Sequence, residues 1–300
     1  MHSLRLLASV ITVLVASVAA MAAPTFPGIG AAMQEKIDQQ EIAGAVTVVF
    51  TKDKVVHLES TGHADLAARR PIAPDTLFWI ASMTKPITGV AVLMLQDEGK
   101  LNIADPVAKY IPEFASLKTP SDRPANLTIT QILTHTSGLG EAAGPAAAHA
   151  RTLAELVPVW LKAPMRFEPG TEWRYCQSGI NLAGRIVEVV SGMTFDAFLQ
   201  QRLFDPLGMK DTTFYPTDSQ RARLATAYSK NKDTGALQPV PPREGYGLRR
   251  HPPQGNGGLY STPNDYTRFG QLLLNRGRYD GKCILSEKAC EVLTSVHTGE

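Results

Sequence analysis

A serine and a lysine, Ser82 and Lys85, lie three residues apart in the segment FWIASMTKPITGVAVLMLQDEGK, residues 78–100. On a helix, residues at this spacing share one face, with Cβ atoms about 5–6 Å apart. Pro86 follows directly, and proline is tolerated only in the first turn of a helix, so the helix must begin close to Ser82. There, a hydroxyl lies in a partial positive field, next to backbone N–H groups that can stabilise an oxyanion. The pair could therefore supply an activated nucleophile.

The lysine could act as the proton acceptor for this serine. It precedes the apolar run Val90 to Leu95, and a lysine packed against apolar surface loses hydration, which lowers its pKa. A neutral amine beside a hydroxyl can then accept a proton during acyl transfer. Ser-x-x-Lys alone is weak evidence, because a chain of this size offers about one match by chance. A second copy, Ser229 to Lys232, lies in a polar segment, and we interpret it as a solvated charge cluster.

Tyr175 is a third candidate for the same chemistry. It follows the Pro169-Gly170 turn and directly precedes an apolar helical segment that begins near Ile180. A tyrosine on such a connection can direct its hydroxyl into a cleft. Beside an ammonium its pKa falls, so it could share the role of base with Lys85. The alternative is an amphipathic side chain at a boundary between lobes.

Other reactive residues show weaker patterns. His135 and Ser137 lie close together, but the chain contains no Gly-x-Ser-x-Gly turn, and we expect His135 to be a packing or turn residue. The seven histidines and three cysteines form no H-E-x-x-H or C-x-x-C spacing, so no metal site is predicted. Cys283 and Cys290 could form a local disulfide in an oxidising compartment, which the sequence leaves open.

The rest of the chain indicates the elements that must position these residues. Residues 28–40 predict an amphipathic helix, and the β-rich runs 43–50 and 55–62 predict a hairpin. Residues 230–254 are rich in proline, glycine and charge and predict a long loop or edge region. Strands followed by helices indicate an α/β (α+β) protein, in which helices flank an antiparallel sheet and a mainly helical lobe is inserted at about 83–250. Further helix signals are a C-cap at Gly99, a cap at Thr128 or Thr130 with an end at Ser137-Gly138, an end at Gly192, a stop at Asp205-Pro206, and a cap at Ser261 or Thr262.

The first residues are typical of a secretory signal peptide. Arg5 precedes an apolar run from Leu6 to Ala20, and Ala20-Met21-Ala22 fits an A-x-A cleavage site. An uncleaved membrane anchor is the alternative, although the run is short for a span. We expect a signal peptide at 1–22, a hydrolase domain at 23–300 without a membrane span, and a periplasmic or secreted protein. The net charge of +2 gives no argument for binding nucleic acid.

Together these residues resemble the serine β-lactamase-like superfamily, which includes class C β-lactamases, DD-peptidases of the same fold and related carboxylesterases. The resemblance implies a β-lactamase/transpeptidase-like fold without a cofactor, and Ser82 as the acylated nucleophile. It also implies that Lys85 and Tyr175 deprotonate Ser82 and later activate water, and that the Ser82 N–H forms half of an oxyanion hole. It runs from about Ile42 to the end through PDTLFWIASMTKPITGVAVLMLQDEGKLNIADPVAKYIPEF, LTITQILTHTSGL, FEPGTEWRYCQSGINLAGRIVE, LFDPLGMKDTTF and GGLYSTPNDYTRF.

Two departures from the family pattern bear on the substrate. Lactamases commonly have Tyr-Ser/Ala-Asn where this chain has Tyr175-Cys176-Gln177. The Gln177 amide could bind a substrate carbonyl, but its extra methylene shifts the group outward, which favours an esterase over a lactamase. The third family motif, Lys-Thr-Gly or His-x-Gly, has only a chance match at His297-Thr298-Gly299, because Glu300 ends the sequence. We therefore expect the chain to be truncated, without the last strands of the sheet.

The sequence thus predicts an exported serine hydrolase that forms an acyl-enzyme on Ser82 and hydrolyses a small ester. One alternative is β-lactamase or D-Ala-D-Ala carboxypeptidase activity on β-lactam or peptide amides. Another is a non-catalytic penicillin-binding or sensing relative. The expected partner is a small-molecule substrate, and the sequence leaves the oligomeric state open.

Overall fold

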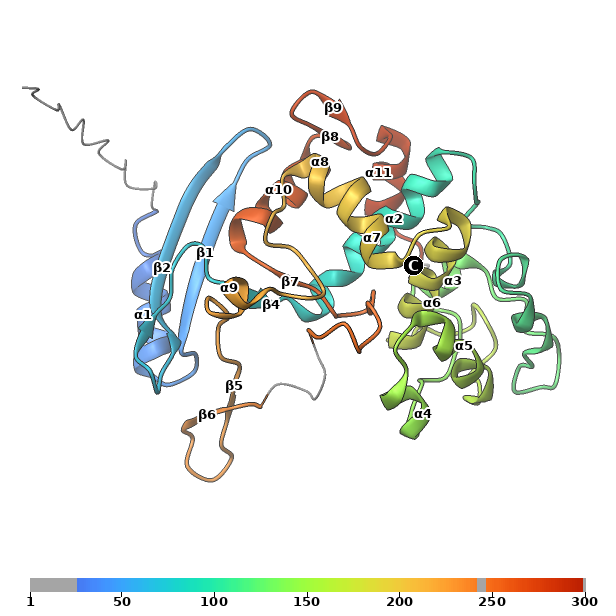
Figure 1. Cartoon of the computed structure of the whole chain (residues 1–300), viewed down its shortest axis with the longest axis horizontal. Coiled ribbons are helices and arrows are strands. Elements are labelled where there is room, and N and C mark those ends of the chain that lie inside the picture. Colours follow the sequence, from blue (N-terminus) through green and yellow to red (C-terminus); the bar gives the residue numbers. More distant parts are fainter. Residues whose placement is uncertain (1–25, 242–246, 299–300) are drawn as a thin grey trace, which may run out of the picture.

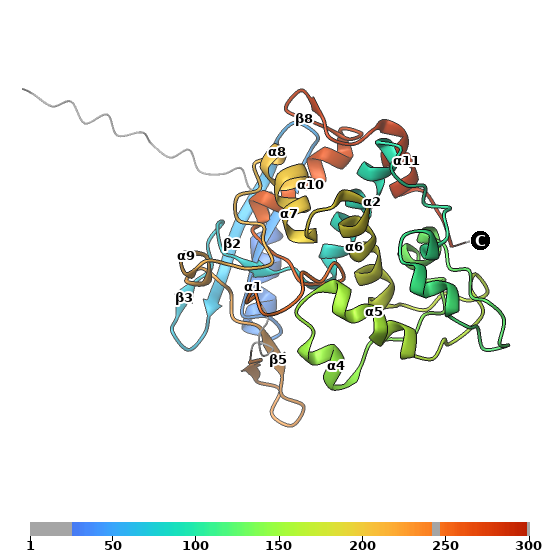
Figure 2. The same cartoon turned by 45° about the vertical axis from the view of Figure 1, so that its right-hand side comes forward.

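The computed structural model describes residues 26–241 and 247–298. Figure 1 shows a β-hairpin on one side and a larger group of helices on the other, with α2 (Thr84–Asp97) between them. The 45° turn in Figure 2 keeps the hairpin and the helices α4 to α6 apart. This arrangement confirms the predicted combination of an antiparallel sheet with a helical part. The predicted signal peptide lies outside the described residues.

The hairpin consists of β1 (Gly44–Phe50) and β2 (Val55–Asp65), as the sequence predicted. They pair antiparallel, and β3 (Arg70–Pro71) extends the sheet beyond β2 in the order β1-β2-β3. Side chains alternate between the two faces of a strand. Phe50 packs against Gly270 of α10 (Pro263–Leu274), whereas Glu59, opposite Thr47, contacts Gly30 of α1 (Ile29–Asp38). The helices α1 and α10 therefore cover opposite faces of the hairpin.

The helical part is built around α6 (Gln177–Ser191). It packs against α2, α3 (Ile129–Leu133), α5 (Leu153–Lys162) and α7 (Phe195–Leu199). Every residue of α2 from Ile87 to Leu95 is buried, which confirms that an apolar helix follows the Ser82–Lys85 pair. The largest fully buried side chains of this core include Trp160, Phe195, Phe198 and Phe204.

Several predicted helix boundaries are confirmed. Gly99 adopts a positive φ of 68° just after α2, Thr128 forms a capping box at the start of α3, and Gly192 ends α6. Thr262 caps α10, because its side chain accepts the N–H of Asp265.

Two predicted helix ends are wrong. The helix α3 ends at Leu133 instead of Ser137-Gly138, because His135 adopts a left-handed φ of 64° that an α-helix cannot continue. The predicted stop at Asp205-Pro206 is also absent. There α7 passes into a π-helical turn, Gln200–Phe204, and continues as α8 (Asp205–Leu207). Pro206 comes just after the π-helical turn, whose backbone bonds have a different spacing, and the helix ends one residue later at Leu207.

The predicted long loop at 230–254 contains part of a small hairpin, β5 (Tyr228–Lys230) and β6 (Leu237–Pro239), which exposes Ser229 and Lys232. Cys176, Cys283 and Cys290 are free thiols, so the disulfide considered between Cys283 and Cys290 is not formed. Within the described ranges, none of the helices combines the length and apolarity that crossing a membrane requires. The remaining elements are β4 (Phe78–Trp79), α4 (Gly144–His149), α9 (Asp218–Arg221), β7 (Tyr260–Ser261), β8 (Arg278–Tyr279), β9 (Lys282–Cys283), α11 (Glu287–Thr294) and the 3₁₀ turns Ala81–Met83, Val107–Lys109 and Pro112–Ser116.

Gly138 is expected to be essential for the stability of the turn after α3. It has a φ of 72°, and an added Cβ would lie 2.1 Å from the carbonyl oxygen of Phe167. Gly138→Ala should lower the free energy of unfolding by about 1–2 kcal/mol for the left-handed conformation and by roughly 1–3 kcal/mol more for the overlap. Gly99→Ala is the matched control, because its φ is 68° but nothing lies within 4 Å of the added Cβ. Equal losses for the two variants in urea unfolding would contradict this prediction.

Candidate active site

Ser82 lies on a 3₁₀ turn, Ala81–Met83, that leads directly into α2. The chain before it is held by β4, where Trp79 pairs with Tyr260 of β7. The Trp79 indole N–H also donates to the carbonyl of Gly257 at 2.6 Å. Ala81 adopts a left-handed φ of 46°, so this turn is held in a conformation that L-residues seldom adopt. The result is an exposed Ser82 hydroxyl at the N-terminal end of a buried helix.

Lys85 is half-buried, and its ammonium nitrogen meets three oxygen atoms. The nitrogen Nζ lies 3.0 Å from Ser82 Oγ, 2.9 Å from Gln177 Oε1 and 2.6 Å from the carbonyl oxygen of Asn256. Three acceptors match the three N–H donors of an ammonium group. The sequence predicted an apolar environment for this lysine, whereas the structure surrounds its charged end with polar groups.

Apolar surface does border Lys85 on another side. A pocket of about 350 Å³ is lined by Lys85 together with residues of α2, α3, α6 and α11. Most of these residues are apolar, and they include Leu93, Leu133 and Ile180. The stem of Lys85 therefore contacts apolar side chains while its nitrogen contacts oxygens, as is common for lysine.

Tyr175 completes the group around Ser82. Its hydroxyl donates to Ser82 Oγ at 2.8 Å, and Lys85 Nζ lies 4.7 Å from the centre of its ring. Partial burial raises the pKa of Tyr175, but the bonds to Lys85 and Ser82 and the charge of Lys85 lower it more, so its pKa lies below the ordinary tyrosine value. Lys85 and Tyr175 therefore both contact Ser82 Oγ, as the sequence predicted, although the polar surroundings of the Lys85 nitrogen differ from the apolar ones that the sequence suggested.

Gln177 is the first residue of α6, which begins three residues earlier than the sequence suggested. Its amide oxygen accepts a hydrogen bond from Lys85. A carbonyl only accepts hydrogen bonds, so the predicted bond to a substrate carbonyl would come from the Gln177 NH₂ group and not from the oxygen that Lys85 contacts. The structure places Gln177 at the site but gives it a contact with Lys85 that the sequence did not predict.

Sequence reasoning missed the loop Gln254–Gly258. The Asn256 carbonyl accepts a bond from Lys85, and the Asn256 N–H donates to Asn181 Oδ1 at 3.1 Å. Thr88 of α2 donates to the carbonyl of Gly255 at 2.8 Å. The only sequence signal was the glycine-rich run Gly255-Asn256-Gly257-Gly258, since glycines permit close backbone approach.

His135 and Ser137 do not act as a pair. Ser137 is buried and its hydroxyl accepts the N–H of Leu139, whereas His135 Nδ1 accepts the N–H of Cys176 at 3.2 Å. His135 is a turn residue, as expected, and its ring lies 4.6 Å from that of Tyr175.

Two further sequence matches remain. Ser229 and Lys232 are exposed on the β5–β6 hairpin. His297 follows α11 and does not lie on a described strand, but it lines the same pocket as Lys85. Gly299 lies outside the described residues.

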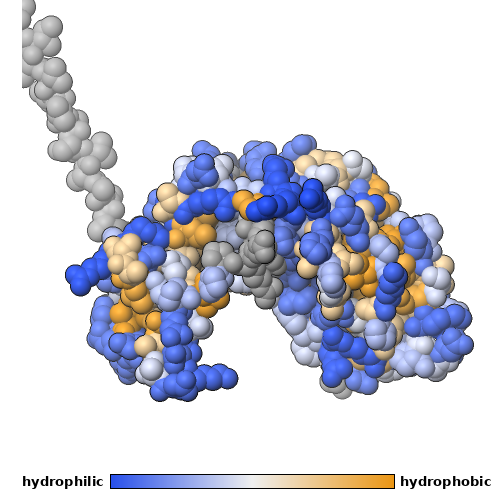
Figure 3. All heavy atoms as spheres, turned by 60° about the horizontal axis from the view of Figure 1, so that its bottom comes forward, coloured by the Kyte–Doolittle hydropathy of each residue, from blue (hydrophilic) through white to orange (hydrophobic). Residues whose placement is uncertain are grey.

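Large apolar side chains are exposed beside the reactive group. Trp79 and Met83, on either side of Ser82 in the chain, are 41% and 48% exposed, and Trp173, which contacts the Tyr175 ring, is 57% exposed. Trp79 and Met83 also line an apolar hollow of about 520 Å³ between β1 and α10. Figure 3 shows the molecule hollowed between its two parts, with apolar atoms on both walls. These surfaces suit a substrate with an apolar group.

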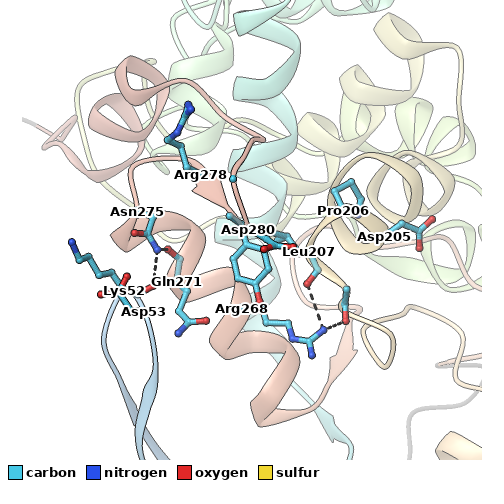
Figure 4. A pocket seen from close by; sticks show the side chains of 13 residues that line it. Lys52, Asp53, Asp205, Pro206, Leu207, Arg268, Gln271, Asn275, Arg278 and Asp280 are labelled. Carbon is cyan, nitrogen blue, oxygen red and sulfur yellow. Dashed lines mark hydrogen bonds between the residues drawn. The ribbon is translucent and has the colours of Figure 1, made fainter.

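A second hollow, of about 740 Å³, lies elsewhere and is polar (Figure 4). It is formed by the turn after β1, α8, the end of α10 and the β8–β9 turn. Arg268 donates to the carbonyls of Leu207 and Gly208, and Asn275 donates to the carbonyl of Lys52 at 2.7 Å. Ser82, Lys85 and Tyr175 are not among the described residues that line it. The reactive group therefore lies outside this polar hollow, and Lys85 instead lines the pocket of about 350 Å³ described above.

Comparisons with known proteins show which family the chain resembles. The family model described as Beta-lactamase matches residues 29–295. Protein Rv1367c of Mycobacterium tuberculosis is 34% identical over 88% of this chain and 70% of its own length. Esterase EstB of Burkholderia gladioli is 30% identical over 79% of this chain and 67% of its own length. The solved structure of EstCE1, a hydrolase with promiscuous acyltransferase activity, has a TM-score of 0.75 at 24% identity and covers 87% of this chain and 74% of its own.

Proposed function

Because this chain belongs to the beta-lactamase family of serine hydrolases, we propose that it forms an acyl-enzyme on Ser82 and hydrolyses small esters. One observation carries this proposal: Lys85 Nζ and the Tyr175 hydroxyl lie 3.0 and 2.8 Å from Ser82 Oγ. We also propose that the protein acts after export, since residues 1–22 have the features of a signal peptide.

The contacts suggest how the proton moves. Lys85 is arranged as an ammonium, which stabilises the phenolate form of Tyr175. Phenolate Tyr175 takes the proton of Ser82 as Oγ attacks the ester carbonyl, and backbone N–H groups at the start of α2 stabilise the oxyanion. The alcohol leaves with the proton from Tyr175, and the same phenolate then activates the water that releases the acid from Ser82.

The ester is preferred to a lactam for three reasons. Gln177 replaces the family asparagine, and its extra methylene shifts the amide outward. Apolar side chains are exposed next to Ser82 and Tyr175, which favours an apolar substrate group. EstB, one of the similar proteins, is named as an esterase.

We predict a clear order of substrates. The purified protein should hydrolyse p-nitrophenyl butyrate with a higher kcat/KM than p-nitrophenyl acetate, because the longer acyl chain can contact the exposed apolar side chains; each buried methylene contributes about 0.8 kcal/mol. Nitrocefin, a chromogenic β-lactam, and a D-Ala-D-Ala peptide should be poor substrates. The measurement is initial rates on all four compounds, with intact-protein mass after mixing.

Each other outcome points to a different function. Faster turnover of nitrocefin or the peptide than of either ester would replace the esterase with a β-lactamase or carboxypeptidase. A stable adduct without turnover would indicate a penicillin-binding or sensing protein. If the protein forms no adduct and turns over none of the four compounds, the enzyme assignment is removed.

A further inference from the structure

The start of α6 contributes two residues to the reactive group: Tyr175 contacts Ser82, and Gln177 contacts Lys85. Both are held in place by hydrogen bonds with one segment earlier in the chain. Tyr175 and Gln177 lie at the start of α6, where Cys176 occupies the N-cap position without a side-chain cap. The first N–H groups of a helix need acceptors, and an uncapped N-terminus is normally unstable. In this chain, residues 135–141, which we call the cradle, supply those acceptors.

His135 holds the backbone on both sides of Tyr175. Its carbonyl accepts the N–H of Arg174 at 2.9 Å, and its Nδ1 accepts the N–H of Cys176 at 3.2 Å. Its ring also packs on the Tyr175 ring, with centres 4.6 Å apart. These three contacts fix the position and direction of the one side chain between the two amides. In this position the Tyr175 hydroxyl lies 2.8 Å from Ser82 Oγ.

Glu141 holds the backbone at Gln177. One carboxylate oxygen accepts the N–H of Gln177 at 2.7 Å, and the other accepts the N–H and the hydroxyl of Ser178 at 2.9 and 2.8 Å. Ser178 in turn accepts the N–H of Ala142 at 2.8 Å, which closes the contact. A carboxylate from another segment thus caps α6, and hydrogen bonds to a charged acceptor are stronger than neutral ones.

We infer that His135 and Glu141 are positioning residues for acyl transfer, with His135 directing Tyr175 at Ser82 and Glu141 directing Gln177 at Lys85. This inference rests on the proposed function. Neither residue contacts Ser82 in the described structure, so each acts through a residue of the reactive group. The left-handed φ of 64° at His135 is part of the device, because it turns the chain so that both the carbonyl and the ring face the start of α6.

The acceptor role requires a neutral His135 with its proton on Nε2. Burial and the nearby charge of Lys85 lower the pKa of His135, which keeps the imidazole neutral at neutral pH. The titratable groups around His135 and Tyr175 are Lys85 on α2, Glu141 in the cradle, and His297 after α11, which lines the same pocket as Lys85 and His135. Displacement of Tyr175 from Lys85 and Ser82 would remove the contacts that lower its pKa.

The test uses acylation rates per active site and their pH dependence. His135→Leu removes the Nδ1 acceptor, and Glu141→Gln replaces an acceptor oxygen with an NH₂ group. The burst of p-nitrophenol from p-nitrophenyl butyrate counts active sites, so misfolded protein does not distort the rate. Both variants should acylate roughly 10–100-fold more slowly than the wild type, because a displacement of a reacting group by about 1 Å can lower the rate by this much. In His135→Leu, the pH of half-maximal rate should also move upward, because a displaced Tyr175 regains an ordinary pKa.

Three further variants separate positioning from stability. His135→Asn keeps an acceptor and tolerates a positive φ, so it should recover most of the rate. His57→Leu is a control for the loss of an imidazole acceptor. The Nδ1 of His57 accepts the N–H of Phe26 at 2.9 Å, but His57 lies on β2 and not in the cradle. Glu155→Gln removes a carboxylate that accepts the Arg151 N–H at 2.7 Å next to α5. The last two should change thermal stability at most, without changing the rate per site or its pH dependence.

The outcomes are distinct. If the wild-type protein shows no acylation, the proposed function fails before the cradle is tested. If the wild type acylates and Glu141→Gln keeps its rate, the assignment of Glu141 is overturned. If His135→Leu keeps the wild-type rate and pH dependence, the assignment of His135 as a positioning residue is overturned. Should His135→Leu fail to fold, the comparison of His135→Asn with a second variant, His135→Gly, decides the role of the side chain, because glycine accepts the same φ without an acceptor.

Discussion

Ser82→Ala should abolish ester hydrolysis by this protein, with a loss in kcat of roughly 10⁶-fold, as for removal of the nucleophile in other serine hydrolases. The Ser82 hydroxyl is the atom on which Lys85 and Tyr175 converge, and alanine leaves them without an oxygen to deprotonate. The measurement is the hydrolysis of p-nitrophenyl butyrate, together with intact-protein mass after reaction with a fluorophosphonate. Wild-type protein should gain one adduct and Ser82→Ala none.

The chain offers a matched control for this experiment. Ser229 and Lys232 repeat the Ser-x-x-Lys spacing, but they are exposed on the β5–β6 hairpin. Ser229→Ala should keep the wild-type rate and the adduct. A fluorophosphonate adduct that persists in Ser82→Ala, or equal residual rates in the two variants, would show that another residue is acylated.

Tyr175→Phe should give the second large effect, a decrease in kcat of roughly 10²–10⁴-fold, the range for loss of a general base. The substitution keeps the ring against His135 but removes the hydroxyl that lies 2.8 Å from Ser82 Oγ. The active form is the phenolate, so the wild-type rate should rise with pH through the pKa of Tyr175. Because Lys85 and Ser82 lower that pKa, the rise should come at a lower pH than for an ordinary tyrosine. The variant should lack this rise.

Tyr266 is a suitable control because it also lies beside the nucleophile. Its hydroxyl donates to the carbonyl of Met83 at 3.0 Å, but burial raises its pKa to about 12, so it stays protonated at neutral pH. Tyr266→Phe should leave the shape of the pH–rate profile unchanged. An unaltered profile in Tyr175→Phe would instead assign the role of base to Lys85 alone.

The residues that sequence reasoning placed correctly are those fixed by local geometry. Ser82 and Lys85 share a helix face because of their spacing, and Pro86 required the helix to begin next to them. The hairpin of β1 and β2 and the cap at Thr128 follow from similarly local patterns. Such features depend on a few neighbouring residues, so the amino-acid order is sufficient to predict them.

Contacts between distant parts of the chain decided the rest of the site. Tyr175 and Ser82 are 93 residues apart, and Lys85 and Asn256 are 171 apart. The turn before Tyr175 and the family resemblance pointed to this residue, but no pattern indicated that a backbone carbonyl would complete the polar surroundings of Lys85. The acceptor role of Glu141 at α6 was equally hidden, since it spans 36 residues. Which distant groups meet depends on how the helices pack as a whole, and that packing sets the charge and the hydrogen bonds around Ser82.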